Sequence, residues 1–151
     1  MNGAERRILV DADACPVKDE VYRVAWRVGV PVTVVSNQHL RVPDHPQVKR
    51  VVVGSGFDAA DDWIAEASGP GAVVITADIL LADRCLKAGA DVLAPTGKPF
   101  TTSSIGAAIA TRAIMADLRA GGEQIGGPAP FSKADRSRFL TALDAVLTRR
   151  C

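Results

Sequence analysis

Short runs rich in branched apolar residues, each followed by a polar turn, are the feature that most limits the fold of this chain. They lie at 8–10, 32–35, 48–53, 72–75 and 92–93. Strands covered on both faces show such runs without regular apolar and polar alternation, whereas strands with one wet face alternate. We therefore predict a mostly parallel sheet of about five strands, covered on both faces.

Stretches with helical spacing of apolar residues separate most of these strands. Pro16 and Gly29 mark the start and the end of the first helix, because proline is tolerated in a first turn and glycine stops helices. Ser132 begins the last helix, with Asp135 as its capping-box partner. Other helices are predicted over 59–67, after Asp78 up to 89, and over 104–119. Strands alternating with helices predict a three-layer α/β/α fold.

Length and charge narrow the class of protein. A chain of 151 residues is near the size that one hydrophobic core supports well, so we predict a single domain over 1–151. Charged residues make up 23% and nearly cancel to +1, which excludes a globally basic nucleic-acid coat. No run approaches the ~20 apolar residues of a membrane helix, and none fits a signal peptide. We expect no membrane association, a cytoplasmic location and reduced thiols at Cys15, Cys85 and Cys151.

Acidic residues follow three of the predicted strands. They are Asp11 and Asp13 after the first strand, Asp58, Asp61 and Asp62 after the third, and Asp78 and Asp83 after the fourth. In parallel sheets, sites form at the carboxyl ends of strands, so these side chains share one rim. Carboxylates gathered there repel one another and need a cation. Mg²⁺ or Mn²⁺ is the natural partner of such oxygen ligands.

Several of these aspartates also have a purely structural interpretation. Asp58 and Asp78 stand where helix N-caps belong, and an N-cap aspartate stabilises a helix without doing chemistry. Asp61 and Asp62 fit a solvated first turn, which the helix dipole favours. The pair of carboxylates at 11 and 13, which directly follows a buried strand, is the hardest to explain by packing.

Polar and basic side chains near the rim are candidate substrate contacts. Ser36, Asn37 and Thr76 are short polar groups that could hold a phosphate oxygen or a metal-bound water, or could simply stabilise turns. Lys133 and Arg136 make the start of the last helix basic. Such cations could bind the phosphates that flank a scissile one, or form an ordinary solvated helix face.

The acidic motifs resemble those of the YaiI/YqxD family of uncharacterised bacterial proteins. The stretches that carry the resemblance are 8–17, 58–64, 76–78, 100–112 and 126–131. The family is similar to the PIN and NYN nuclease-like domains, so the resemblance implies a PIN-like fold that binds Mg²⁺ or Mn²⁺ and cuts RNA. It implies that Asp11 is the first ligand and Asp78 the later one, with Asp61 or Asp62 between them.

Three functions remain open from the sequence. The first is a metal-dependent ribonuclease or phosphodiesterase in which Asp11, Asp13 and Asp78 are catalytic and a metal-activated water attacks RNA or another phosphodiester. The second is a non-catalytic RNA- or protein-binding module that retains the acidic rim. The third is an aspartyl-phosphate phosphatase, for which Lys133 comes late in the chain. The tryptophans and the alanine-rich helix over 104–119 leave room for a symmetric homodimer.

Overall fold

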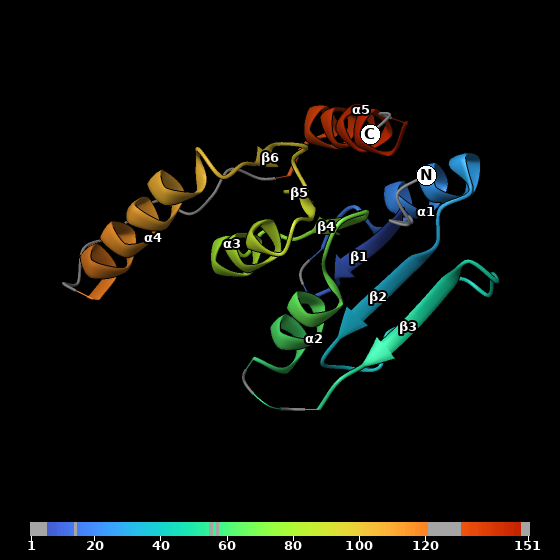
Figure 1. Ribbon diagram of the computed structural model, residues 1–151, viewed down its shortest axis with the longest axis horizontal. Helices are drawn as coiled ribbons and strands as arrows, with labels where there is room; N and C mark the ends of the chain where they lie inside the picture. The colour runs from blue at the N-terminus through green and yellow to red at the C-terminus, as the bar shows by residue number, and fades with distance from the viewer. Residues whose placement is uncertain (1–5, 14, 55, 57, 121–130, 149–151) are drawn as a thin grey trace.

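The centre of the molecule is a twisted sheet (Figure 1). The computed structural model describes residues 6–13, 15–54, 56, 58–120 and 131–148, with side chains for all of these except 116–120. Within this part of the chain the sheet has six strands in the order β3-β2-β1-β4-β5-β6, all parallel except the β5–β6 pair. The strands are β1 (Arg7–Asp11), β2 (Val32–Ser36), β3 (Val48–Val52), β4 (Ala72–Ile75), β5 (Asp91–Leu93) and β6 (Pro99–Phe100). The mostly parallel sheet is confirmed, with one strand more than predicted.

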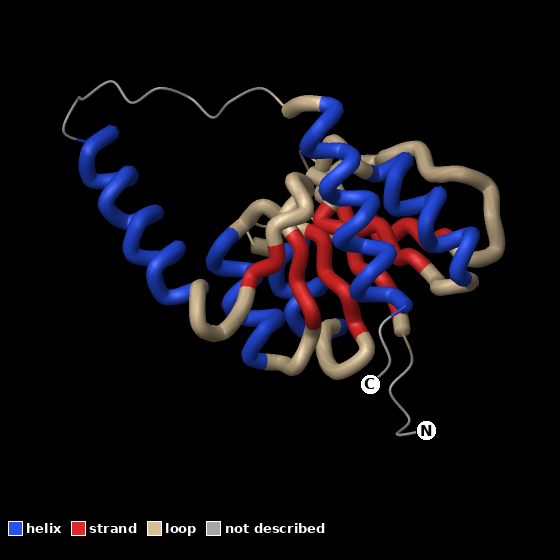
Figure 2. The backbone as a smooth tube through the Cα atoms, turned by 90° about the horizontal axis from the view of Figure 1, so that it is seen from above, coloured by secondary structure: helices blue, strands red, loops and turns tan. Residues whose placement is uncertain are grey.

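Helices cover both faces of this sheet. The helices that do so are α1 (Lys18–Val28), α2 (Ala59–Ala67), α3 (Ile79–Lys87) and α5 (Lys133–Thr148), while α4 (Ile105–Ala120) lies to one side (Figure 2). A hydrophobic core lies on each face of the sheet, and alternate residues of β1 contribute to different cores. Ile8 and Val10 pack with α1 and α5, whereas Leu9 packs with α2 and α3. The predicted three-layer α/β/α fold is confirmed.

The edge strand β3 corrects one expectation. Its run was predicted to be covered on both faces, but Lys49, Arg50 and Val52 are exposed. The reason is its place at the edge of the sheet, where charged side chains discourage pairing with another chain. The short β6 was predicted as loop, because proline and glycine dominate residues 95–99.

The ends of α1 agree only partly with the prediction. Gly29 ends the helix in the left-handed conformation, with φ of 75°, as expected. The helix begins at Lys18 rather than in a turn that contains Pro16, because the first carbonyl of the helical ladder is that of Val17. Pro16 lies in the preceding turn, where its carbonyl accepts a hydrogen bond from Arg136 at 2.7 Å.

The last helix is fastened at its first turn. Ser132 and Asp135 exchange hydrogen bonds between side chain and backbone at 3.0 and 3.1 Å, which confirms the predicted capping box. Phe139, Leu143 and Leu147 are its buried stripe.

The helix α4 extends away from the body of the molecule and lies nearest α3 (Figure 2). Ile114 on this helix is 59% exposed. The homodimer through such surfaces stays a prediction. Within the described residues, no helix combines the length and the apolar character needed to cross a membrane. The cytoplasmic location also stays a prediction.

Candidate functional site

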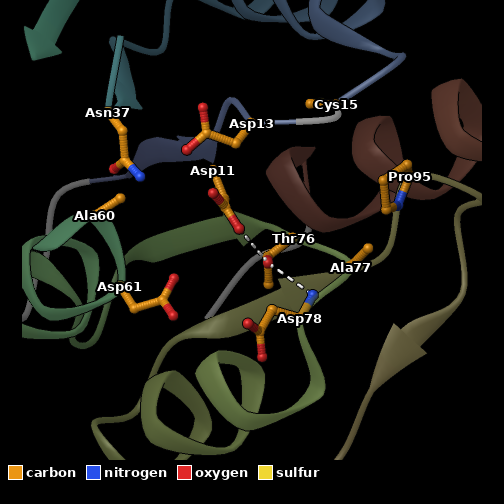
Figure 3. Close-up of a pocket in the computed structure, with 10 residues that line it drawn as sticks. All are labelled: Asp11, Asp13, Cys15, Asn37, Ala60, Asp61, Thr76, Ala77, Asp78 and Pro95. Carbon is orange, nitrogen blue, oxygen red and sulfur yellow. Dashed lines mark hydrogen bonds between the residues drawn. The ribbon is translucent and has the colours of Figure 1, made fainter. Parts of the chain in front are cut away.

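A polar pocket lies at the carboxyl ends of β1 and β4 (Figure 3). The strand order reverses between these two strands, and such switch points are where open α/β sheets bind ligands. The pocket has a volume of about 290 Å³ and is lined by Asp11, Asp13, Cys15, Asn37, Ala60, Asp61, Thr76, Ala77, Asp78 and Pro95. The predicted convergence of aspartates from three segments at one rim is therefore present.

Asp11 is the most constrained carboxylate of the pocket. It is the last residue of β1, and its Oδ2 accepts a hydrogen bond of 2.8 Å from the buried hydroxyl of Thr76. Burial raises the pKa of Asp11 from 3.8 to about 6, and the charges of Asp61, Asp13 and Asp78 add to this rise. The hydrogen bond from Thr76 opposes the rise in pKa but does not cancel it. The pocket therefore disfavours a negative charge on Asp11 in the absence of a cation.

Asp78 has a structural role and also faces the pocket. Its Oδ1 accepts hydrogen bonds from the backbone N–H groups of Leu80 and Leu81 at 2.9 and 3.1 Å, so it caps α3. Both capping bonds use Oδ1, so capping does not occupy Oδ2. The N–H of Asp78 donates to the Thr76 hydroxyl at 3.0 Å. Thr76 thus connects Asp11 to the N-cap residue of α3.

Asp61 and Asp13 approach the pocket from different segments. Asp61 lies in the first turn of α2, and its pKa is raised by partial burial and by Asp78. Asp13 is exposed in the turn that follows β1. Lys18 steadies this turn, because its Nζ donates to the backbone carbonyls of Ala12 at 3.4 Å and Cys15 at 2.9 Å.

Two of the predicted metal ligands do not line the pocket. Asp62 forms a salt bridge with Arg84 at 2.9 Å, and Asp83 forms one with Lys87 at 3.0 Å. Asp62 follows Asp61 by one residue, which turns its side chain by about 100° around the helix axis. Asp61 and Asp62 were the two candidates for the ligand between Asp11 and Asp78, and Asp61 is the one that lines the pocket. Asp58 stands at the N-cap position of α2 without a side-chain capping bond.

Of the two polar residues at the end of β2, one stabilises a turn and the other lines the pocket. The Ser36 hydroxyl is buried, donates to the carbonyl of Gln38 at 2.6 Å and accepts from its N–H at 2.9 Å, so it stabilises a turn. Asn37 is exposed and lines the pocket. Asn37 and Thr76 are therefore the two predicted short polar contacts that the structure places in this pocket.

The predicted basic contacts lie elsewhere. Arg136 donates to the Pro16 carbonyl and to the carboxylate of Glu20 at 3.3 Å, and its guanidinium lies 4.9 Å from the ring centre of Phe131. These contacts attach α5 to the start of α1. Lys133 is exposed and does not line the pocket. The phosphatase alternative therefore lacks its lysine there.

Cys15 and Pro95 are pocket residues that sequence reasoning missed as site residues. Cys15 is buried, and burial raises the pKa of its thiol. Pro95 follows β5, whose carboxyl end lies at the same rim as those of β1 and β4. That position is the signal that could have identified it.

The donor set of the pocket fits a hard divalent cation that retains water. Carboxylate, amide and hydroxyl oxygens are the ligands of Mg²⁺ and Mn²⁺. In the described part of the chain, no group of three or more His, Cys, Asp or Glu side chains is placed to hold one ion directly. Mg²⁺ commonly binds through one or two carboxylates and several waters, so such a cage is not required.

Residues 9–149 match the sequence model of a protein family, the uncharacterised YaiI/YqxD family. The chain belongs to this family. Every residue that lines the pocket lies inside the matched range. The family identified from the acidic motifs is thus confirmed, whereas the PIN-like relationship stays a prediction.

Similar proteins extend over nearly the whole chain. A UPF0178 protein of Sphingopyxis alaskensis is 76% identical over 143 residues, which cover 94% of this chain and 93% of the relative. A UPF0178 protein of Nitrobacter winogradskyi is 62% identical over 95% of this chain and 91% of its own length. These names state no activity. No solved structure matches the chain significantly.

Proposed function

We propose that this YaiI/YqxD protein is a metal-dependent phosphodiesterase that cleaves RNA at the acidic pocket. The observation that carries the proposal is the position of Asp11: a partly buried carboxylate at the switch point of the sheet, with Asp13, Asp61 and Asp78 around the same pocket. Placing four carboxylates together opposes folding unless a ligand compensates for their repulsion. A site that binds a divalent cation supplies this compensation.

The side chains of the pocket have different roles in the proposed reaction. Asp11, oriented by the Thr76 hydroxyl, and Asp78, oriented by its capping bonds, are the ligands whose positions are fixed before any ion arrives. Asp13 and Asp61 complete the negative field. A bound divalent cation supplies positive charge for the phosphoryl transition state and lowers the pKa of a water nucleophile. Asn37 lines the pocket, and in this proposal its amide donates to a phosphate oxygen.

Calorimetric titration of Mn²⁺ is the direct test of the site. We expect saturable binding to the wild type and its loss in Asp11→Asn, because the variant removes one charge from the cluster. Asp83→Asn is the matched control, since Asp83 pairs with Lys87 and does not line the pocket. We expect the wild type and Asp83→Asn to cleave labelled RNA, and Asp11→Asn to lose cleavage.

The test has clear negative outcomes. If Mn²⁺ fails to bind the wild type, or if Asp11→Asn retains full cleavage, the proposed function is wrong. The capping role of Asp78 favours one second candidate, a non-catalytic RNA- or protein-binding module with a structural acidic rim. That candidate predicts RNA binding without cleavage, and binding that Asp11→Asn leaves intact.

A further inference from the structure

A second hollow adjoins the acidic pocket. It is a groove of about 860 Å³ between α4 and the body of the molecule. Ala77 and Pro95 line both the groove and the pocket, so the two hollows lie side by side. Figure 3 shows Ala77 and Pro95 on the side of the pocket away from Asn37 and Asp61. A ligand whose phosphate lies among the aspartates could therefore extend past these two residues into the groove.

The wall of the groove differs chemically from the pocket. Phe100 and Phe131 supply aromatic surface, and Lys98 and Arg112 supply positive charge. Flat apolar rings stack on aromatic side chains, and cations attract phosphate. The groove therefore fits a ligand that combines a planar ring with an anionic backbone. Its volume is within the range of about 300–1,000 Å³ that is usual for small-molecule sites.

The sequence of α4 provides the space. Ala107, Ala108, Thr111 and Met115 line the groove and recur at the three- and four-residue spacing of one helix face. Three of these four side chains are small, so the face leaves the groove open. A large side chain at position 107 would fill it.

We propose that the groove binds an unpaired base of a single-stranded nucleic acid whose neighbouring phosphate lies in the acidic pocket. A base inside a duplex is paired and stacked on both sides, so it cannot insert between α4 and the body of the molecule without leaving the stack. The inference rests on the proposed function and adds a preference for single strands, which the pocket alone does not give.

Fluorescence anisotropy with three labelled ligands tests this inference. The ligands are a single-stranded RNA of twelve nucleotides, its blunt duplex, and an abasic strand of the same length, with Ca²⁺ replacing Mg²⁺ to slow turnover. We expect the single strand to bind more tightly than the other two. Ala107→Trp should weaken single-strand binding about tenfold, the effect of losing roughly one stacked base.

Two further variants sharpen the result. Ala110→Trp introduces the same side chain at an exposed position of α4 that does not line the groove, so its affinity should match the wild type. Arg112→Gln should reduce the slope of log Kd against log salt by about one, as expected for one lost phosphate contact. Arg112 is exposed, so this variant tests the groove even if Ala107→Trp fails to fold.

The outcomes separate this inference from the proposed function. If folded Ala107→Trp binds the single strand like the wild type, if the duplex binds equally well, or if Arg112→Gln leaves the salt slope unchanged, the groove inference is wrong. These results do not alter the Mn²⁺ titration. Failure of Mn²⁺ to bind, or full cleavage by Asp11→Asn, instead overturns the proposed function, whatever Ala107→Trp shows.

Discussion

Replacement of Asp11 by asparagine should stabilise the protein at neutral pH. In the unfolded chain this carboxyl ionises near its ordinary pKa of 3.8, whereas in the folded protein its pKa is about 6. Between these values the unfolded state binds fewer protons, so the free energy of unfolding falls as pH rises from about 4 to about 6 and stays low above that range. Asparagine cannot ionise, and it keeps an oxygen that can accept from Thr76.

The magnitude follows from the difference in pKa. A shift of about two units corresponds to ~3 kcal/mol at most. Since Asp11 is only partly buried and water screens its charge, we expect a gain of about 1–2 kcal/mol for Asp11→Asn at pH 7. The variant should show no such gain near pH 4, where the wild-type carboxyl is protonated in the folded state.

Urea denaturation at pH 4, 5, 6 and 7, followed by tryptophan fluorescence, measures this effect. Asp83→Asn is again the control, and it should be unchanged or slightly less stable because it loses an exposed pair worth about 0.5 kcal/mol or less. Mn²⁺ at 100 times its Kd should raise the stability of the wild type by ~2.7 kcal/mol but not that of Asp11→Asn. A variant no more stable than the wild type at pH 7, with the same pH dependence, would refute the reasoning.

Two other substitutions test the supports of the site. Thr76→Val removes the hydroxyl shared by the Asp11 carboxylate and the Asp78 N–H, so we expect a loss of ~1–3 kcal/mol of stability and a higher pKa of Asp11, measured by denaturation and by NMR titration. Gly97→Ala should cost about 1–3 kcal/mol, because Gly97 has φ of 89° and an added Cβ would lie 2.7 Å from the backbone of Arg138. A melting temperature equal to that of the wild type would contradict the Gly97 prediction.

Much of the fold could be predicted because its signals are local. The bounds of α2 and β4 match the predicted 59–67 and 72–75, since serine, glycine and proline residues separate the two elements. The antiparallel β6 could not be predicted, because its two residues pair with β5 through a tight turn rather than through a recognisable apolar run. The strand β6 forms because of its pairing with β5, which the local sequence does not reveal.

The candidate site was predictable only in part, for a similar reason. Strand ends are visible in the sequence, so the convergence of Asp11 and Asp78 could be expected. The rotation of a helix about its axis is not visible, and it decides that Asp61 lines the pocket while Asp62 pairs with Arg84. Contacts between residues far apart in the sequence could not be predicted either. Arg136 was predicted to bind substrate, but it donates a hydrogen bond to the Pro16 carbonyl.

The contact between Arg136 and the Pro16 carbonyl has a consequence for the order of folding. It joins the turn that follows the acidic segment to a helix some 120 residues later. Phe139 and Leu143 of α5 belong to the same core cluster as Ile8 and Val10. During synthesis, a nascent chain that already displays its aspartates would therefore lack one wall of its core until α5 leaves the ribosome. The residues that line the pocket lie between Asp11 and Pro95, but the core that supports β1 is completed by residues of α5.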